Sequence, residues 1–155
     1  MDILQDKSLS CLIEKLNGNN KDNFPYINHS NCRITSPQDD KYNCIAWGGG
    51  DKNHWWCPKR YWLENIPRVP SMSNLIKIFE KLGYKICNNC HLEDGITKIV
   101  LYCTEDNMPT HVAIQLKTGK WSSKLGALED IEHDTPKVLE GKTYGQARIF
   151  MYKTF

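Results

Sequence analysis

The chain has 155 residues, of which 40% are hydrophobic and 25% are charged, and its formal net charge is +2. These proportions are typical of one globular domain and exclude an intrinsically disordered chain, which has fewer apolar residues and a larger net charge. The near balance of basic and acidic residues gives no electrostatic basis for binding nucleic acid or an anionic membrane.

The sequence also bears on where the protein is found. Its first twelve residues, MDILQDKSLSCL, contain acidic side chains and no apolar signal-peptide core, and no run of eighteen apolar residues follows. We therefore expect a cytoplasmic protein, or one delivered by a route that needs no signal peptide. The seven cysteines are odd in number and come without an export signal, so reduced thiols are expected rather than a disulfide framework.

We expect one domain over residues 1–155, which begins with a short amphipathic helix within residues 1–20. Leu9, Leu12 and Leu16 share one helical face, and an Asn-Gly pair ends it. Residues 21–43 are polar, contain two prolines and lack periodicity, so they are predicted to be a loop that wraps over the surface. The core is then predicted to span residues 44–155.

Two further helices are predicted before the chain changes character. A brief helical turn begins at Asn43 or Cys44 and is broken by the glycines at 48–50. A longer helix is capped by Ser71 or Ser73, shows an apolar stripe over 75–82, and ends at Gly83.

After Gly83 the pattern favours strands. Segments rich in β-branched and aromatic residues alternate with turn signals, and we predict up to five mostly antiparallel strands at 84–87, 96–103, 110–117, 120–124 and 144–153. A short helix opens at Thr135-Pro136 and closes at Gly141. Helices first and strands second, with short connections, indicate an α+β fold.

Cys44 is the cysteine whose surroundings favour chemistry. A thiol in the first turn of a helix is close to free backbone N–H groups, which lower its pKa and can also hold an oxyanion. The three glycines that follow would let a substrate backbone come close. The alternative is a structural cysteine in the apolar run Cys-Ile-Ala-Trp.

His111 is the histidine best placed to act as the base for such a thiol. It lies at the beginning of the alternating strand THVAIQL, and the Lys-Thr-Gly-Lys turn then returns the chain beside it. Ser123 on the returning strand is predicted to contact the far ring nitrogen of His111 and to fix its tautomer. Asp130, Glu132 and His133 are competing candidates for that third position.

Two other features of the sequence bear on binding sites. Cys87-Asn-Asn-Cys90-His91 matches half of a zinc site, but no second Cys-x-x-Cys pair is present, so neither a metal nor a cofactor is expected. Trp55 and Trp56 belong to an aromatic cluster after Cys44, and they are predicted to line a substrate groove.

The motifs support two resemblances. The first is to a family of small bacterial proteins without an assigned activity, and it rests on these strings in this order: YNCIAW, WW, YW, LGY, KIVLY, THVAIQL, GKWSSKLG, EDIEH, LEG and YG. This likeness covers about residues 42–152. It implies an architecture more than an activity.

The second, looser resemblance is to NlpC-type cell-wall peptidases of the papain-like group. HVAIQLKTGKWSS is similar to their histidine hairpin, in which a third polar residue follows the histidine by twelve positions, and Ser123 stands there. Cys44 matches their helix-borne cysteine, although Asn-Cys-Ile-Ala replaces Asp-Cys-Ser-Gly. The resemblance implies a papain-like fold with a cysteine-bearing helix packed on an antiparallel sheet of about five strands.

The resulting hypothesis is a cysteine-dependent hydrolase or acyltransferase that acts on a peptide or protein amide. Cys44 would be the nucleophile, His111 the base and Ser123 its positioning residue, in a peptidase, amidase, deamidase or transglutaminase. One alternative is a non-catalytic binding or interaction module on the same fold. Another is an interaction domain stabilised by zinc at Cys87, Cys90 and His91.

Overall fold

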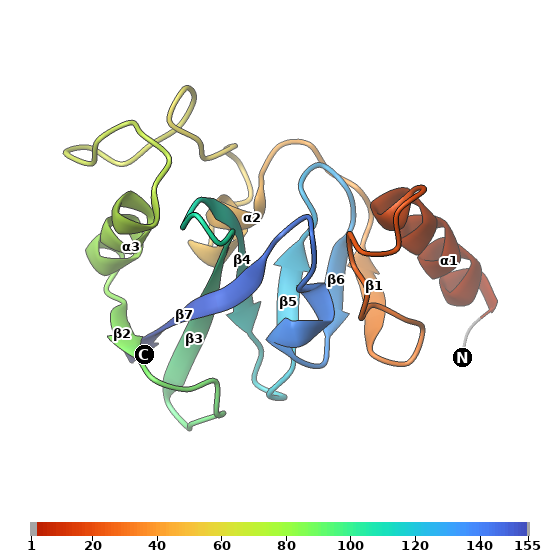
Figure 1. The fold of residues 1–155 in the computed structure, drawn as a ribbon. Coiled ribbons are helices and arrows are strands. Elements are labelled where there is room, and N and C mark those ends of the chain that lie inside the picture. Colours follow the sequence, from red (N-terminus) through yellow and green to blue (C-terminus); the bar gives the residue numbers. More distant parts are fainter. Residues whose placement is uncertain (1–2, 155) are drawn as a thin grey trace.

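The computed structural model describes residues 3–154. In that part of the chain, seven strands form one antiparallel sheet in the order β1-β6-β5-β4-β3-β7-β2 (Figure 1). The strands are β1 (Cys32–Ser36), β2 (Lys85–Cys87), β3 (Ile96–Cys103), β4 (Pro109–Gln115), β5 (Trp121–Lys124), β6 (Asp130–His133) and β7 (Gln146–Thr154). The helices are α1 (Ile3–Asn17), α2 (Cys44–Gly48), α3 (Met72–Lys81) and the 3-10 helix η1 (Pro136–Leu139).

Each face of the sheet has its own hydrophobic core, because successive side chains of a strand point to opposite faces. On β3, Ile99 and Leu101 belong to the core that α2 and α3 cover, whereas Val100 and Tyr102 belong to the core that α1 and η1 cover. Figure 1 shows α1 beside β1 at one edge of the sheet and α3 near the opposite edge.

Helix α2 packs closely on β4, and this contact requires a glycine. A Cβ atom built on Gly48 would lie only 2.7 Å from Val112 Cγ1 and 3.3 Å from the ring of Phe79. Any larger residue would push the helix away from the sheet. The close approach places Cys44, the first residue of α2, near the beginning of β4.

The predicted papain-like fold with about five strands is wrong. The five predicted strands are present as β2, β3, β4, β5 and β7, but β1 and β6 extend the sheet at one edge to seven strands. β1 lies inside segment 21–43, which was predicted to be a surface loop, and it pairs with β6 through Cys32 opposite His133. Both strands are short, so their backbone hydrogen bonds to a neighbour define them more than local sequence preference does.

The predicted helices are present. Ser71 accepts a hydrogen bond from the backbone N–H of Asn74 at 3.1 Å and caps α3, and Thr135 precedes η1. None of the helices in residues 3–154 has the length and apolar character needed to cross a bilayer.

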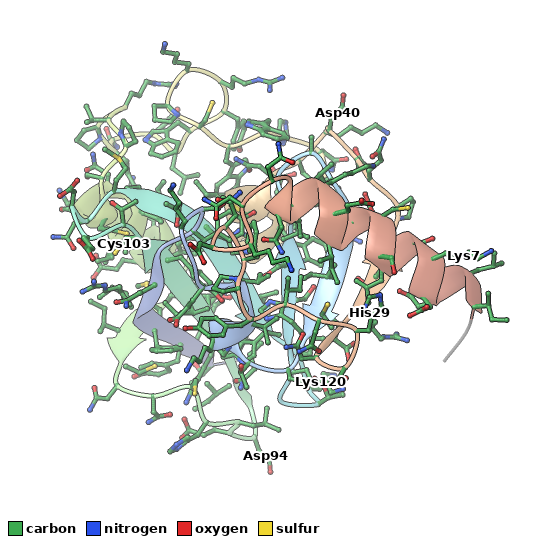
Figure 2. All side chains as sticks on the ribbon, turned by 45° about the vertical axis from the view of Figure 1, so that its right-hand side comes forward. Lys7, His29, Asp40, Asp94, Cys103 and Lys120 are labelled. Atoms are coloured by element: carbon green, nitrogen blue, oxygen red, sulfur yellow. The ribbon has the colours of Figure 1, made fainter. Side chains whose placement is uncertain are left out.

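The two ends of the sheet carry different loops. Asp94 and Lys120 lie in turns at one end, and Asp40 lies at the other, in the segment that leads to α2 (Figure 2). The long loop between α2 and α3 extends above this second end, where β4 begins (Figure 1). Cys44 and His111 both belong to this end.

Candidate active site

Asn43 holds Cys44 in place. Its side-chain oxygen accepts a hydrogen bond from Ala46 N (3.2 Å), which caps α2, and a second one from Trp56 N (3.1 Å). Its amide nitrogen donates to Trp56 O at 2.7 Å. One buried side chain therefore begins the helix of Cys44 and fixes the following loop beside it.

A buried carboxylate fixes the segment before α2. Asp130 accepts hydrogen bonds from the Ser36 hydroxyl (2.6 Å) and the Tyr42 hydroxyl (2.9 Å), and Lys124 Nζ lies 5.2 Å from the centre of the Tyr42 ring. Because Tyr42 directly precedes Asn43, these contacts position the beginning of α2.

Cys44 is a neutral thiol at neutral pH, contrary to the lowered pKa that was predicted for it. Burial raises the pKa of this thiol to about 11. The backbone N–H groups of Val112, Ile45 and Cys44, together with the ammonium of Lys124, act in the opposite direction and favour the thiolate. Desolvation exceeds these contributions, so the helix start does not by itself produce a thiolate.

His111 is buried and its ring is held between aromatic residues. Tyr144 stacks on it with ring centres 4.2 Å apart and an interplanar angle of 6°, and Tyr102 contacts it at 5.3 Å in an edge arrangement. Burial lowers the pKa of His111 well below its usual value, and the neighbouring His133 adds to this effect. The imidazole is therefore neutral at pH 7.

A hydrogen-bonded chain runs diagonally across three strands from His111 in β4 through Ser123 in β5 to His133 in β6. His111 Nε2 and Ser123 Oγ are 2.9 Å apart, and Ser123 Oγ and His133 Nε2 are 2.7 Å apart. The chain ends at Thr135, whose carbonyl oxygen lies 2.8 Å from His133 Nδ1. The contact between Ser123 and the far ring nitrogen of His111 confirms the prediction from the hairpin.

This chain determines where each proton lies. A carbonyl oxygen only accepts, so His133 Nδ1 carries a proton and donates it to Thr135. Burial lowers the pKa of His133 to about 4, so its Nε2 is an acceptor at pH 7 and receives the single hydroxyl proton of Ser123. Ser123 Oγ then accepts from His111 Nε2–H.

It follows that His111 Nδ1 is unprotonated. This atom is buried and has no hydrogen-bond partner within the described residues. An unpaired buried acceptor of this kind costs roughly 1–3 kcal/mol, which makes it unusual in a folded protein. The arrangement leaves an unprotonated ring nitrogen without a hydrogen-bond partner among the described residues.

Cys44 and His111 approach the same cavity from opposite faces of the sheet. Helix α2 packs on the face of Val112, whereas the ring of His111 lies on the face of Tyr102 and Ala113. A cavity of about 330 Å³ at the beginning of β4 contains residues from both sides, including Cys44, His111 and Tyr144. The residue that carries the thiol and the residue that carries the unpaired ring nitrogen thus line one cavity.

Of the competing third residues, the structure brings only His133 into this chain of hydrogen bonds, behind Ser123. Asp130 binds Ser36 and Tyr42 as described above. Glu132 lies 3.8 Å from the basic groups of Arg33 and Lys120. Both carboxylates are therefore used elsewhere.

Trp55 and Trp56 line the cavity, and their predicted role in binding a substrate stays a prediction. Trp56 is buried, and its indole N–H donates to Asp51 at 2.8 Å. Trp55 is half-buried and lies under the guanidinium of Arg60 at 5.7 Å. Both residues belong to the same cavity lining as Cys44.

The Cys-x-x-Cys-His segment does not form a metal site in the described chain. Cys87 ends β2, and its thiol lies 3.6 Å from the Asn89 carbonyl oxygen, while Cys90 and His91 are exposed. Within residues 3–154 no group of three or more His, Cys, Asp or Glu side chains is arranged to hold a metal ion.

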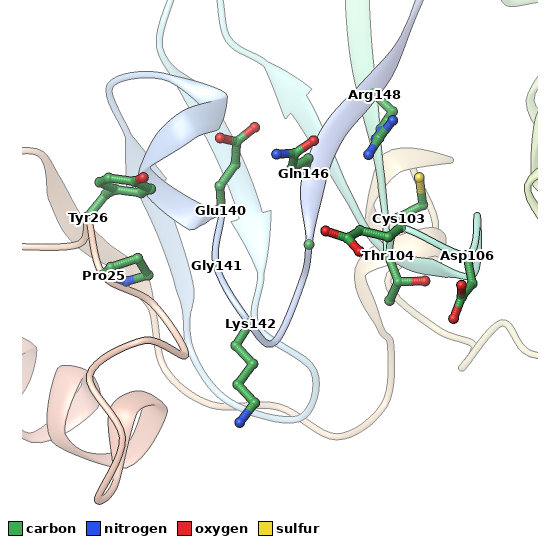
Figure 3. A pocket seen from close by; sticks show the side chains of 12 residues that line it. Pro25, Tyr26, Cys103, Thr104, Asp106, Glu140, Gly141, Lys142, Gln146 and Arg148 are labelled. Atoms are coloured by element: carbon green, nitrogen blue, oxygen red, sulfur yellow. The ribbon is translucent and has the colours of Figure 1, made fainter.

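A second cavity of about 500 Å³ lies at the loop before β7, and Figure 3 shows its lining. Glu140, Asp106 and Arg148 contribute charged groups, and Cys103 is the thiol nearest to it. Cys103 itself is buried, and the histidines described here lie outside this lining. The smaller cavity, which joins a thiol to an imidazole, is therefore the candidate active site.

Sequence reasoning missed two residues of this site. Tyr144 was predicted only as the first residue of a strand, and its stacking on His111 depends on a contact between segments 33 positions apart. Asn43 was considered only as a helix start, although its amide also holds Trp56. An Asn directly before a predicted helix is a capping signal, whereas nothing local indicates the role of Tyr144.

The model of a domain of unknown function, DUF7689, matches residues 33–152. The chain belongs to this family. The matched range includes every residue of the candidate site, from Asn43 to Tyr144. No curated protein and no solved structure matches the chain. The resemblance of the histidine hairpin to NlpC-type peptidases stays a prediction.

The raised pKa predicts slow alkylation of Cys44. At pH 7 iodoacetamide should label the exposed thiols of Cys11 and Cys90 first, and labelling of Cys44 should increase with pH towards a midpoint near 11. Mass-spectrometric mapping after short pulses at several pH values measures this. Fastest labelling at Cys44 at pH 7 would contradict the desolvated neutral thiol.

The buried state of His133 predicts a loss of stability in acid. The pKa of His133 is about 4 in the folded chain and about 6.5 when unfolded, so between these values the unfolded chain binds more protons. Stability should fall as the pH falls from about 6.5 to 4, by a contribution on the order of 3 kcal/mol, and this contribution should then level off.

Urea unfolding at several pH values, compared between the parent and His133→Gln, isolates this contribution. The variant should show the shallower decline between pH 6.5 and 4. The exposed His91→Gln serves as the matched control and should keep the slope of the parent. Equal slopes for the parent and His133→Gln would mean that His133 is not held neutral by the fold.

Proposed function

We propose that the protein is a cysteine-dependent acyl-transfer enzyme that acts on an amide through Cys44 and His111. The observation that carries this proposal is the free Nδ1 of His111, which the hydrogen-bonded chain keeps unprotonated in a residue that lines the same cavity as Cys44. The proposal depends on this local arrangement and not on a papain-like fold.

The chemistry begins from a neutral thiol and a neutral imidazole. As Cys44 Sγ attacks the carbonyl carbon, the S–H proton passes to His111 Nδ1 and the carbonyl π electrons move to oxygen. When the tetrahedral intermediate collapses, the C–N bond breaks and His111 returns the proton to the leaving amine. Water or another amine then attacks the thioester, with His111 acting again as base.

The charges that develop in this reaction have partners in the site. Positive charge on His111 is stabilised through Nε2–H, which donates to Ser123, while His133 orients the Ser123 hydroxyl. Backbone N–H groups of Cys44 and Ile45 and the nearby Lys124 ammonium favour negative charge at the sulfur. Such preorganised donors provide most of the stabilisation in acyl transfer.

The substrate class expected from this chemistry is a peptide or protein amide, and the proposed compartment is the cytoplasm. Peptidase, amidase, deamidase and transglutaminase reactions share the steps above. They differ in the acceptor and in the group that enters the cavity.

A binding module without turnover is the second candidate, and one observation favours it. The raised pKa of Cys44 keeps the thiol protonated in the unliganded protein, so nucleophilicity depends on proton transfer to His111. If the bound ligand does not bring the thiol and Nδ1 into contact, the cavity binds without reacting.

Reaction with an activated ester distinguishes the two candidates. p-Nitrophenyl acetate should acetylate Cys44, and His111→Gln should slow this step by about 10²–10⁴-fold because the general base is lost. Ser123→Ala should have a smaller effect, because it removes one neutral hydrogen bond worth roughly 1 kcal/mol. Intact-mass kinetics and peptide mapping give the rates and the site.

Cys44→Ala is the variant that must lose the modification, and Cys11→Ser, which removes an exposed thiol on α1, is the matched control that must keep it. Acetylation confined to Cys11 or Cys90, or equal rates at Cys44 in the parent and His111→Gln, would exclude acyl transfer and leave the binding module.

A further inference from the structure

We infer that the cavity beside Cys44 accepts an uncharged apolar side chain, aromatic or large aliphatic, next to the amide that is cleaved. This inference rests on the proposed acyl transfer and names its substrate class. It follows from the composition of the cavity wall, from the hydrogen bonds that the wall already makes, and from its size.

The wall carries no formal charge. Its described lining residues include neither Asp, Glu, Lys nor Arg, and its apolar part is formed by Trp55, Trp56, Trp62 and Leu75 with several prolines. His111 is neutral in its buried position. A carboxylate or ammonium group that entered this space would lose its hydration and find no partner of opposite charge in the lining itself; the Lys124 ammonium near Cys44 and the Arg60 guanidinium over Trp55 belong to residues outside it.

Most polar groups of the wall are already used inside the protein. The Asn43 side chain is fully engaged with Ala46 and Trp56. Three further donors are directed to internal acceptors: Trp56 Nε1 to Asp51, Trp62 Nε1 to the Pro67 carbonyl at 3.1 Å, and the Thr110 hydroxyl to the Tyr144 carbonyl. A polar ligand would therefore find few groups to replace its bonds to water.

Among the described residues, the lining side chains that have a polar group without an internal hydrogen-bond partner include Cys44, His111 at Nδ1, Trp55 and Tyr144. Cys44 carries the thiol, and His111 Nδ1 is without a partner in the described chain. A ligand with one amide and one apolar group matches this division, because its carbonyl meets the thiol and its side chain meets the tryptophans.

The volume has room for one large side chain together with the amide that carries it. About 330 Å³ lies at the lower end of the range of about 300–1,000 Å³ that small-molecule sites occupy. Indole walls also give large contact areas at little entropic cost, which favours an aromatic or branched aliphatic occupant.

Binding to the Cys44→Ser variant tests the inference without requiring turnover. The probes are N-acetyl-phenylalaninamide, N-acetyl-leucinamide, N-acetyl-lysinamide and N-acetyl-aspartic acid amide, titrated by NMR chemical-shift perturbation. We expect the two apolar probes to bind about tenfold or more tightly than the two charged ones, with shifts at Trp55, Trp56 and Trp62. Equal affinities, a preference for a charged probe, or shifts elsewhere would overturn the inference.

A charge placed in the wall provides a second test. Cys57 is a half-buried lining residue that takes no part in the proposed chemistry. Cys57→Asp should weaken binding of N-acetyl-phenylalaninamide by about fivefold or more, whereas the matched Cys57→Ser should change it by less than about twofold. Equal binding by these two variants would contradict an apolar site.

The result is separable from the acyl-transfer proposal. Selective apolar binding in Cys44→Ser together with no acetylation of Cys44 in the parent would reject the enzyme and retain the cavity assignment. Acetylation of Cys44 without apolar selectivity would retain the acyl-transfer enzyme and reject the assignment of the cavity to an apolar side chain.

Discussion

The carbonyl oxygen of Thr135 accepts a hydrogen bond and never donates one, and the rest of the site depends on this constraint. It requires a proton on His133 Nδ1 and a lone pair on His133 Nε2, which orients the Ser123 hydroxyl and in turn leaves His111 with its proton on Nε2. The three side chains that are linked in this way belong to the adjacent strands β4, β5 and β6. The free base beside Cys44 is a consequence of the constraint at Thr135.

Burial has two opposite effects at this site. It raises the pKa of Cys44 and lowers that of His111, so both groups are neutral before substrate arrives. The same burial strengthens each electrostatic interaction that forms once charge develops. A reaction that separates charge only in the transition state is compatible with both effects, whereas a resting thiolate–imidazolium pair is not.

Local pattern predicted the centre of the sheet well. Residues 96–103 form β3 with the predicted bounds, and the turn after β4 places Ser123 opposite Ala113, one diagonal step from His111, within reach of its ring. β1 and β6 were missed because five- and four-residue strands at an edge carry little periodicity of their own. The papain-like assignment came from the resemblance of the histidine hairpin to NlpC-type peptidases, and the seven-strand sheet contradicts it.

The electrostatic state of the site could not be predicted from sequence. The pKa of Cys44 depends on how completely α2, the loop at Trp56 and the beginning of β4 enclose the sulfur, and these segments meet only in the folded chain. The stacking of Tyr144 on His111 could not be predicted either, since it joins residues that share no local sequence pattern. Chemistry-bearing residue types were visible in the sequence, but their protonation states were not.

The protonation states of the two buried histidines are the central claim, and long-range ¹H–¹⁵N NMR of the imidazole rings at pH 7 measures them directly. The account predicts two neutral rings of opposite tautomer, with His133 protonated at Nδ1 and His111 protonated at Nε2. A proton on His111 Nδ1, or a charged imidazolium at either position, would contradict it.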